Sequence, residues 1–403
     1  TTALDVSIQA QILTEMRDLA AETGTALVWI SHDLATVSTL ASRLLVMYAG
    51  RIVEQGPVAA VLRDPHHPYT AGLQHPHGFV HMHEVHKHFS PQLSLGDRIA
   101  ARLGASVETR SVRAVDGVSL DIARGESLGV VGESGCGKST LGRMVAGILT
   151  PSSGSVAVDG APVMADGKKI DTRVQMIFQD PFASLDPRMR IGDIIAEGPL
   201  AHGLTSKTEQ AGYVAGYLER AGLDASLVRR FPHQFSGGQR QRIAIARALA
   251  MQPEVLVCDE PVASLDVSIQ AQIINLFLAL QRDLGLTLIF ISHDLSVVRH
   301  LSDRVAVMYL GRIVEEGPAE QVYTVPAHPY TKGLLASVPR LVLDETDLVT
   351  LDAIEGEIPS PLSPPAGCNF NPRCPLAEQR CVRDDPELRF VRSGHLAACH
   401  FAE

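Results

Sequence analysis

Short runs of hydrophobic residues recur along the chain, separated by polar and glycine-rich stretches. A run of strand length that ends in polar residues is typical of a buried strand, and a longer run with helical spacing is typical of a helix. The pattern predicts strands at 128–131, 176–178, 255–259 and 288–291, and helices at 141–149 and 243–250. Buried strands that alternate with helices indicate an α/β fold.

Part of this pattern occurs twice. Residues 4–12 recur unchanged as residues 265–273, and the match continues at the same spacing as far as residues 328–331. The first copy lacks the strands that precede the repeat in the second copy, and a fragment without its central strand cannot bury a normal core. We therefore interpret the chain as a tandem protein cut inside its first domain, rather than as one with a genuine short N-terminal domain.

The repeat sets the expected domain boundaries. The C-terminal part of a first domain is expected at residues 1–73, a linker at 74–79, a complete second domain at 80–340 and a C-terminal extension at 341–403. The first domain would retain only the segments that repeat in the second.

Composition and charge narrow the class of protein. With 45% hydrophobic and 20% charged residues, the chain has the composition of a globular protein. Its formal net charge of −10 argues against a dedicated nucleic-acid binder. No apolar run approaches the roughly 18 residues of a membrane span. Six cysteines are too few for a disulfide scaffold in 403 residues.

A glycine-rich segment with the pattern G-x-x-x-x-G-K-[ST] follows the predicted strand 128–131 and precedes a predicted helix. In this context the backbone N–H groups of such a loop cradle nucleotide phosphates. Lys138 is expected to reach the β- and γ-phosphates, and the Ser139 hydroxyl to bind Mg²⁺. The expected phosphate-binding residues are Gly132, Glu133, Ser134, Gly135, Cys136, Gly137, Lys138, Ser139 and Thr140.

Polar side chains at the ends of other predicted strands supply candidates for catalysis. Asp259 ends an apolar strand and is expected to hold Mg²⁺, while Glu260 is the candidate base for the attacking water. Gln179 follows another apolar run, where its amide can reach the metal or the water. His293 follows the strand 288–291 and is expected to contact the γ-phosphate.

In this order, these motifs resemble the nucleotide-binding subunits of ABC transporters over nearly the whole chain. The resemblance implies a P-loop ATPase cassette, with a mixed sheet and an α-helical subdomain, that binds ATP and Mg²⁺. It identifies Gln179 with the Q-loop, His293 with the switch histidine and Phe89 with the aromatic residue that stacks on adenine. Phe235 stands before the signature motif, where leucine is commoner. The resemblance adds five residues to the nucleotide site, namely Ser236, Gly237, Gly238 and Gln239 of the signature and Asp266 of the D-loop.

The same resemblance implies partners. In this family two cassettes close head to tail on two ATP molecules, so one phosphate loop and one signature require a second cassette, from a second copy or a paralogous subunit. Two transmembrane permeases would dock near Gln179, and an extracytoplasmic binding protein would select the cargo. The expected location is the cytoplasmic face of the inner membrane, with no nucleic acid bound. The alternatives are a twin-cassette ATPase that acts on ribosomes or DNA, and a truncation product that binds ATP poorly.

Further segments resemble the oligopeptide and dipeptide importer ATPases in particular. They include residues 178–188, the His-Pro-Tyr sequence 328–330 and the C-terminal extension. Peptide is therefore the expected cargo, with glutathione or a nickel chelate as alternatives. Members of this group with four cysteines in the extension carry a [4Fe–4S] cluster there, which implies a cluster on Cys368, Cys374, Cys381 and Cys399.

Judged from the residues alone, those four cysteines indicate metal ligation rather than disulfides. Their spacing, C-x5-C-x6-C-x17-C, lacks the C-x2-C pair of a zinc ribbon, which weakens zinc as the alternative without excluding it. Four unrelated thiols are the third interpretation.

A run of histidines lies between residues 75 and 88, so metal binding must be considered there too. Because residues 80–89 are expected to form the first strand of the complete cassette, we favour sheet and linker positions for them. The run comprises His75, His77, His81, His83, His86 and His88.

Overall fold

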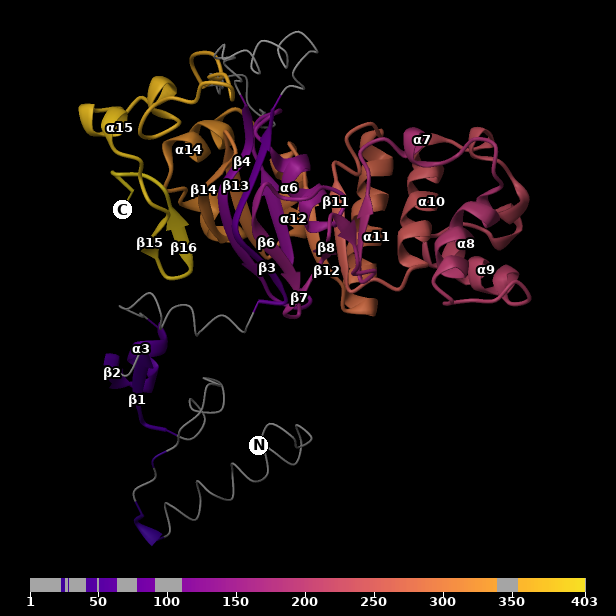
Figure 1. The fold of residues 1–403 in the computed structure, drawn as a ribbon, viewed down its shortest axis with the longest axis horizontal. Coiled ribbons are helices and arrows are strands. Elements are labelled where there is room, and N and C mark those ends of the chain that lie inside the picture. The colour runs from indigo at the N-terminus through magenta and orange to yellow at the C-terminus, as the bar shows by residue number, and fades with distance from the viewer. Residues whose placement is uncertain are drawn as a thin grey trace, which may run out of the picture. The chain divides into compact units, whose positions relative to one another are not determined.

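The computed structural model describes residues 23–25, 28, 41–48, 51–63, 78–90, 111–338 and 354–402. The chain divides into two compact units, residues 1–77 and residues 78–403, which are described separately (Figure 1). In the first copy of the repeat, Asp5 and His32 correspond to the D-loop Asp266 and the switch His293, and both lie outside the described residues. The expected boundary at residue 340 lies outside them too. Within the described part, no helix is both long and apolar enough to cross a membrane.

The second unit is built on an eight-stranded sheet with the order β10-β11-β12-β5-β13-β14-β16-β15. The first five of these strands pair in parallel and the remaining ones pair antiparallel, which confirms the expected mixed sheet. The strands are β10 (Val174–Ile177), β11 (Val255–Asp259), β12 (Thr287–Ile291), β5 (Ser127–Val131), β13 (Arg304–Tyr309), β14 (Arg312–Pro318), β16 (His395–Ala397) and β15 (Arg389–Arg392).

A second sheet, with the order β4-β3-β6-β7, packs against one face of the first. Its strands are β3 (Val80–Phe89), β4 (Val112–Ile122), β6 (Ser153–Val158) and β7 (Ala161–Pro162), followed by the small pair β8 (Met164–Ala165) and β9 (Lys168–Lys169). Because side chains alternate along a strand, β11 and β12 contribute to two cores. Val257 and Ile289 belong to the core that includes α6 and the second sheet, whereas Leu256 and Leu288 belong to the core on the other side.

An α-helical subdomain lies at one end of the unit, as expected from the resemblance (Figure 1). It contains α7 (Pro181–Ser184), α8 (Ile191–Ala201), α9 (Gln210–Arg220) and α10 (Gly237–Leu249), with the 3₁₀ turns η1 (Ala225–Arg229) and η2 (Pro232–Gln234). The predicted helix 243–250 therefore begins earlier than expected. It begins at Gly237 because Ser236 caps it.

The other helices connect the strands of the sheets. They are α6 (Lys138–Val145), α11 (Val267–Leu284), α12 (Leu295–Leu301), α13 (Ala319–Thr324) and α14 (Pro329–Ala336), followed in the C-terminal segment by η3 (Asn371–Arg373) and α15 (Gln379–Arg383). The prediction of a helix at 141–149 was displaced. The helix begins at Lys138, directly after the left-handed Gly137, and it ends at Val145 before Gly147, which also has a positive φ.

The first unit contains a hairpin of β1 (Arg43–Tyr48) and β2 (Arg51–Pro57), followed by α3 (Val58–Arg63). Its pairing repeats that of β13 and β14 residue for residue, with a register shift at the equivalent place. The environments differ, because Met47 is 59% exposed whereas its counterpart Met308 is fully buried. The structure thus confirms the internal repeat at the level of strand pairing.

Candidate active site

The phosphate loop connects β5 to α6, as predicted. Gly132 and Gly137 have positive φ values of 151° and 109°, and a Cβ at these positions would lie 2.2 Å from the carbonyl oxygen of Met308 and 2.1 Å from that of Ala114. The loop can follow this path only with glycine at both positions. Lys138 is buried, and its Nζ donates to the carbonyl oxygens of Gly132 and Glu133 at 2.8 and 3.0 Å.

The predicted magnesium ligands Ser139 and Asp259 meet at the carboxyl end of the sheet. Ser139 Oγ donates to Asp259 Oδ1 over 2.7 Å. Burial raises the pKa of Asp259, while the hydrogen bond from Ser139 and the charges of Arg143 and Lys138 act in the opposite direction. A hydroxyl and a carboxylate side by side form an oxygen donor set that suits Mg²⁺.

The three predicted catalytic residues meet at one carboxylate. Gln179 Nε2 donates to Glu260 Oε2 at 2.8 Å, and His293 Nδ1 lies 3.3 Å from Glu260 Oε1. Glu260 has a φ of 47°, a left-handed conformation that is costly for a residue with a side chain. Gln179 reaches the carboxylate from beyond the end of β10, and His293 from beyond the end of β12. The arrangement fixes both oxygens of a base that can accept a proton from water.

The remaining predicted nucleotide contacts lie at the surface of the unit. Ser236 Oγ accepts from the N–H of Gln239 at 3.4 Å, and Gln239 Oε1 accepts from the N–H of Ser236 at 3.1 Å, which closes a capping box. Asp266 precedes α11 and is exposed, and Phe89 ends β3 with 43% of its surface exposed.

Two family models match the chain. The ABC transporter model matches residues 115–263, and the model of the oligopeptide/dipeptide transporter C-terminal region matches residues 53–76 and 314–381. The oligopeptide transport ATP-binding protein OppF of Escherichia coli is 50% identical over 285 residues, which is 69% of this chain and 85% of that protein. The chain belongs to the ATP-binding subunits of ABC importers. It is therefore an ATPase.

Other similar proteins extend the comparison. The glutathione import ATP-binding protein GsiA of Pectobacterium atrosepticum is 44% identical over 373 residues, which is 84% of this chain and 60% of that protein. Among solved structures, cbiO1 from Clostridium perfringens, part of the cbiONQ transporter complex, matches with a TM-score of 0.50 and 29% identity. The match covers 62% of this chain and 92% of that one. The C-terminal model matches both copies of the repeat, in agreement with the internal duplication.

In this importer ATPase, the C-terminal segment reaches the phosphate loop directly, a contact that the sequence did not reveal. Arg373 donates to both carboxylate oxygens of Glu133, at 2.7 and 3.0 Å. The hydroxyl of Tyr330, from the His-Pro-Tyr sequence, accepts from the N–H of Glu133 at 2.8 Å. Tyr309 and Phe370 pack around Tyr330, with ring centroids 4.7 and 5.4 Å away. One residue of the loop is thus held from outside the nucleotide-binding core.

The four cysteines of the extension share one region of the importer ATPase. Charge interactions link Cys368 to Cys374, Cys381 and Cys399, and burial raises the pKa of Cys368 to about 11. Three of the sulfurs accept a hydrogen bond from the backbone N–H two residues later, which is that of Phe370, Leu376 or Phe401. Among the described residues, no three of the cysteine sulfurs lie within 4.8 Å of one another.

Proposed function

We propose that this ATPase powers peptide uptake through two partner permeases, with Glu260 as the base that activates the attacking water. The observation that supports this role of Glu260 is the contact of its two oxygens with Gln179 Nε2 at 2.8 Å and His293 Nδ1 at 3.3 Å. A peptide cargo is supported by the similarity to OppF and by the C-terminal model of oligopeptide/dipeptide transporters.

The roles of the phosphate-loop residues follow from their present partners. Lys138 Nζ now bonds carbonyl oxygens of its own loop, and in the complex it would exchange them for phosphate oxygens without an unpaired buried charge. Ser139 and Asp259 would hold Mg²⁺, which neutralises charge on the phosphates when it is bound. Gln179 and His293 keep the Glu260 carboxylate aimed, so that one oxygen can accept the proton of a water.

A second cassette would complete the ATP site. The exposed Ser236 and Gln239 at the start of α10, with the exposed Asp266, offer a surface for the nucleotide that the phosphate loop of a partner holds. The N-terminus of α10 carries partial positive charge, which suits a γ-phosphate. Either a second copy of this chain or a paralogous subunit fits this arrangement.

The permeases would dock at a groove beside the Q-loop. A cavity of about 530 Å³ lies between the sheet edge and the helical subdomain, and it is lined by residues that include Met176, Phe178, Ile194, His202 and Arg247. Phe178 directly precedes Gln179, so an occupant of this groove can move the side chain that positions Glu260. A peripheral position on the cytoplasmic face of the inner membrane follows from this docking.

Transport measurements decide the cargo. The chain, its partner cassette and the permeases are reconstituted in vesicles that hold ATP inside, with the binding protein supplied outside, and uptake of a labelled dipeptide, an oligopeptide, glutathione and a nickel chelate is compared. Peptide uptake that requires Glu260 supports the proposal. Uptake of glutathione alone would favour the relationship to GsiA instead. Purification with ribosomes or DNA, and without permeases, would contradict transport altogether.

The extension fits a metal cofactor, and we assign Cys368, Cys374, Cys381 and Cys399 as the ligands of a [4Fe–4S] cluster. Backbone N–H groups aimed at three of the sulfurs stabilise thiolates. The sequence spacing C-x5-C-x6-C-x17-C, which lacks the C-x2-C pair of a zinc ribbon, favours the cluster over a single Zn²⁺. When bound, the cluster would supply a covalent cross-link between segments of the extension.

Elemental analysis tests this assignment. After anaerobic expression and purification, the chain is expected to contain iron and acid-labile sulfide, and Cys368→Ser is expected to lose both. Zinc at one ion per chain, without iron or sulfide, would reject the cluster in favour of the alternative metal. If the chain contains neither iron nor zinc, the four cysteines are unrelated thiols.

A further inference from the structure

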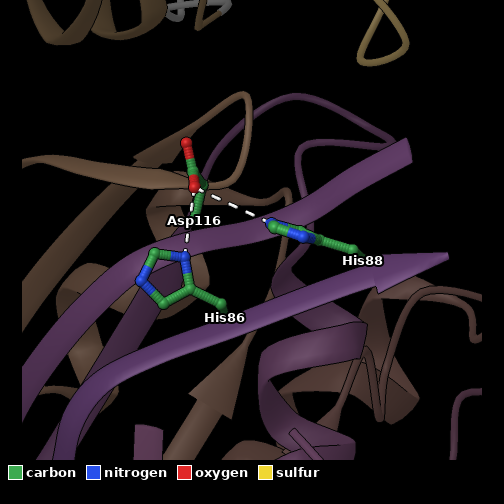
Figure 2. Close-up of side chains that lie close together, drawn as sticks. All are labelled: His86, His88 and Asp116. Atoms are coloured by element: carbon green, nitrogen blue, oxygen red, sulfur yellow. Dashed lines mark hydrogen bonds and ion pairs between the residues drawn. The ribbon is translucent and has the colours of Figure 1, made fainter. Parts of the chain in front are cut away.

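A second group of metal-binding side chains lies far from the Mg²⁺ ligands in sequence, on the outer face of the second sheet. Val85 is fully buried, so strand alternation places His86 and His88 on the opposite face of β3. Asp116 follows the buried Val115 on the neighbouring β4 and lies on the same outer face. Figure 2 shows the three side chains converging between the two strands.

The nitrogen and oxygen atoms of this group are close to the positions of metal ligands. His86 Nδ1 lies 3.2 Å and His88 Nε2 lies 3.9 Å from the same oxygen, Asp116 Oδ1. All three ligand atoms lie within 4.8 Å of one another, which holds for no other such group among the described residues. Tetrahedral Zn²⁺, with bonds of about 2.0 Å to nitrogen and oxygen, separates its ligands by about 3.3 Å. Only small shifts of His86 Nδ1, His88 Nε2 and Asp116 Oδ1 would bring them to the separations found around Zn²⁺.

The backbone beside the group departs from regular strand geometry. Glu84 has a φ of 46°, which is costly outside glycine, and Gly117 has a φ of 74°. A Cβ at Gly117 would lie 3.6 Å from the ring of His86. The pairing of β3 with β4 shifts register between residues 82 and 88. Irregularities of this kind redirect side chains within a sheet, and here they lie on both strands beside the group.

The charges around Asp116 leave one of its oxygens to the histidines. Arg312 donates to Asp116 Oδ2 from Nη2 at 2.9 Å and from Nε at 3.1 Å, and Arg113 lies 3.9 Å from the same oxygen. Although burial raises it, the pKa of Asp116 is lowered overall, because Arg312 and His86 bond its charged form. Arg312 thus orients the carboxylate, as residues behind metal ligands commonly do.

There is room for a further ligand. A cavity of about 580 Å³ borders the group and is lined by Glu84, His86, Asp116, Arg312 and Asp385, among others. Glu84 Oε2 lies 3.9 Å from the second ring nitrogen of His86. The histidine side chains are 27% and 39% exposed, so an ion can reach them from solvent. Water from the cavity can complete a four-coordinate site.

We propose that His86, His88 and Asp116 form a binding site for a transition-metal dication such as Zn²⁺ or Co²⁺. Two imidazoles and a carboxylate are donors that such ions prefer, in contrast to the all-oxygen set that suits Mg²⁺. The ion would cross-link β3 to β4 next to Phe89, the residue expected to stack on adenine. The alternative is a purely hydrogen-bonded group, in which Asp116 accepts from neutral imidazoles.

Cobalt titration tests the site on the full chain without an affinity tag, after chelation. Thiolate ligation gives Co²⁺ an intense sulfur-to-metal charge-transfer band, and imidazole and carboxylate ligation does not, so the cysteines can be told apart from this site. The wild-type chain is expected to bind a Co²⁺ ion without that band. His86→Gln/His88→Gln is expected to lose this ion, whereas the control His81→Gln/His83→Gln, on the same strand, keeps it.

Three results would overturn the proposal. They are no sulfur-free Co²⁺ binding by the wild type, equal binding by both double variants, or loss of binding with the control alone. Thermal unfolding of each chain without metal verifies the fold, and Asp116→Asn provides a second variant that keeps both histidines. ATPase activity is not the readout, so the result does not depend on the proposed function.

Discussion

Arg373 of the C-terminal segment and Glu133 of the phosphate loop form a bidentate ion pair, although 240 positions separate them in the chain. The Arg373 side chain is 4% exposed and that of Glu133 is 23% exposed. Planar, paired contacts of this kind fix direction as well as distance. The C-terminal segment therefore helps to set the shape of the loop that receives phosphate.

Removal of this pair is expected to weaken ATP binding. In Arg373→Gln, Glu133 loses its partner, and we expect a loss of stability of about 3 kcal/mol and a rise in the Kd for ATP. Arg380→Gln, on the exposed side of α15, is the matched control. Nucleotide titration and urea unfolding measure the two effects. An unchanged Kd for ATP in Arg373→Gln would show that the ion pair has a structural role only.

Glu260→Gln is expected to bind ATP and to lose turnover by a factor of about 10² to 10⁴, because an amide cannot accept the proton of water. With its oxygen toward Gln179 Nε2 and its NH₂ group toward His293 Nδ1, the isosteric amide can keep both contacts and should leave the site assembled. Phosphate release and retention of nucleotide are measured, with Glu320→Gln as a surface control. Full activity of Glu260→Gln would show that Glu260 is not the general base.

The positive φ of Glu260 predicts a conflict between stability and activity. Glu260→Gly and Glu260→Ala both remove the carboxylate, but only glycine tolerates a φ of 47° at no steric cost. We expect Glu260→Gly to be more stable than Glu260→Ala by about 1 kcal/mol, with turnover lost in both. Equal unfolding free energies would mean that the strand end relaxes freely.

The stability of the fold is expected to decrease as the pH is lowered, because of His328 in the His-Pro-Tyr sequence. Burial lowers the pKa of His328 from 6.5 to about 4, and its Nδ1 accepts from the N–H of Tyr330 at 3.0 Å. The unfolded chain therefore binds more protons between these values, and stability falls as the pH falls through this window. Between about pH 7 and about pH 5 the loss from this residue is about 2 kcal/mol.

The variant His328→Asn isolates that contribution, since asparagine can cap a helix without titrating. Its unfolding free energy should depend less steeply on pH in the same window. The carboxyl of Glu315, whose pKa is lowered because His395 and the N–H of Ala327 bond it despite its burial, acts only at lower pH. Parallel pH profiles of the wild type and His328→Asn would contradict the assignment.

The sequence predicted the parts of this site that depend on local pattern. The strand 255–259 was predicted with its observed bounds, because a buried apolar run that ends in a carboxylate needs no distant information. The start of α6 was misplaced, because the left-handed conformation of Gly137 depends on the close approach of the Ala114 carbonyl.

Contacts between distant segments could not be read from the pattern. An arginine beside a cysteine gave no signal that Arg373 would reach Glu133, since charged residues usually face solvent. The left-handed backbone of Glu260 was equally hidden, because the sequence resembles any strand end there. The histidine run was assigned to sheet and linker positions. β3 confirms the sheet positions of the four members from His81 onward, whereas His75 and His77 lie outside the described residues. Only the neighbouring strand reveals that Asp116 faces two of the four.

The shared pairing of the two hairpins has a consequence for the order of folding. β1 and β2 adopt the same register as β13 and β14 in a sheet of only two strands. The register is thus encoded within about fifteen residues, a short loop that costs little entropy to close. The parallel strand β5 must instead pair with β12, a segment more than a hundred positions further along the chain. The hairpin is therefore expected to gain hydrogen-exchange protection early in refolding, before the nucleotide site exists.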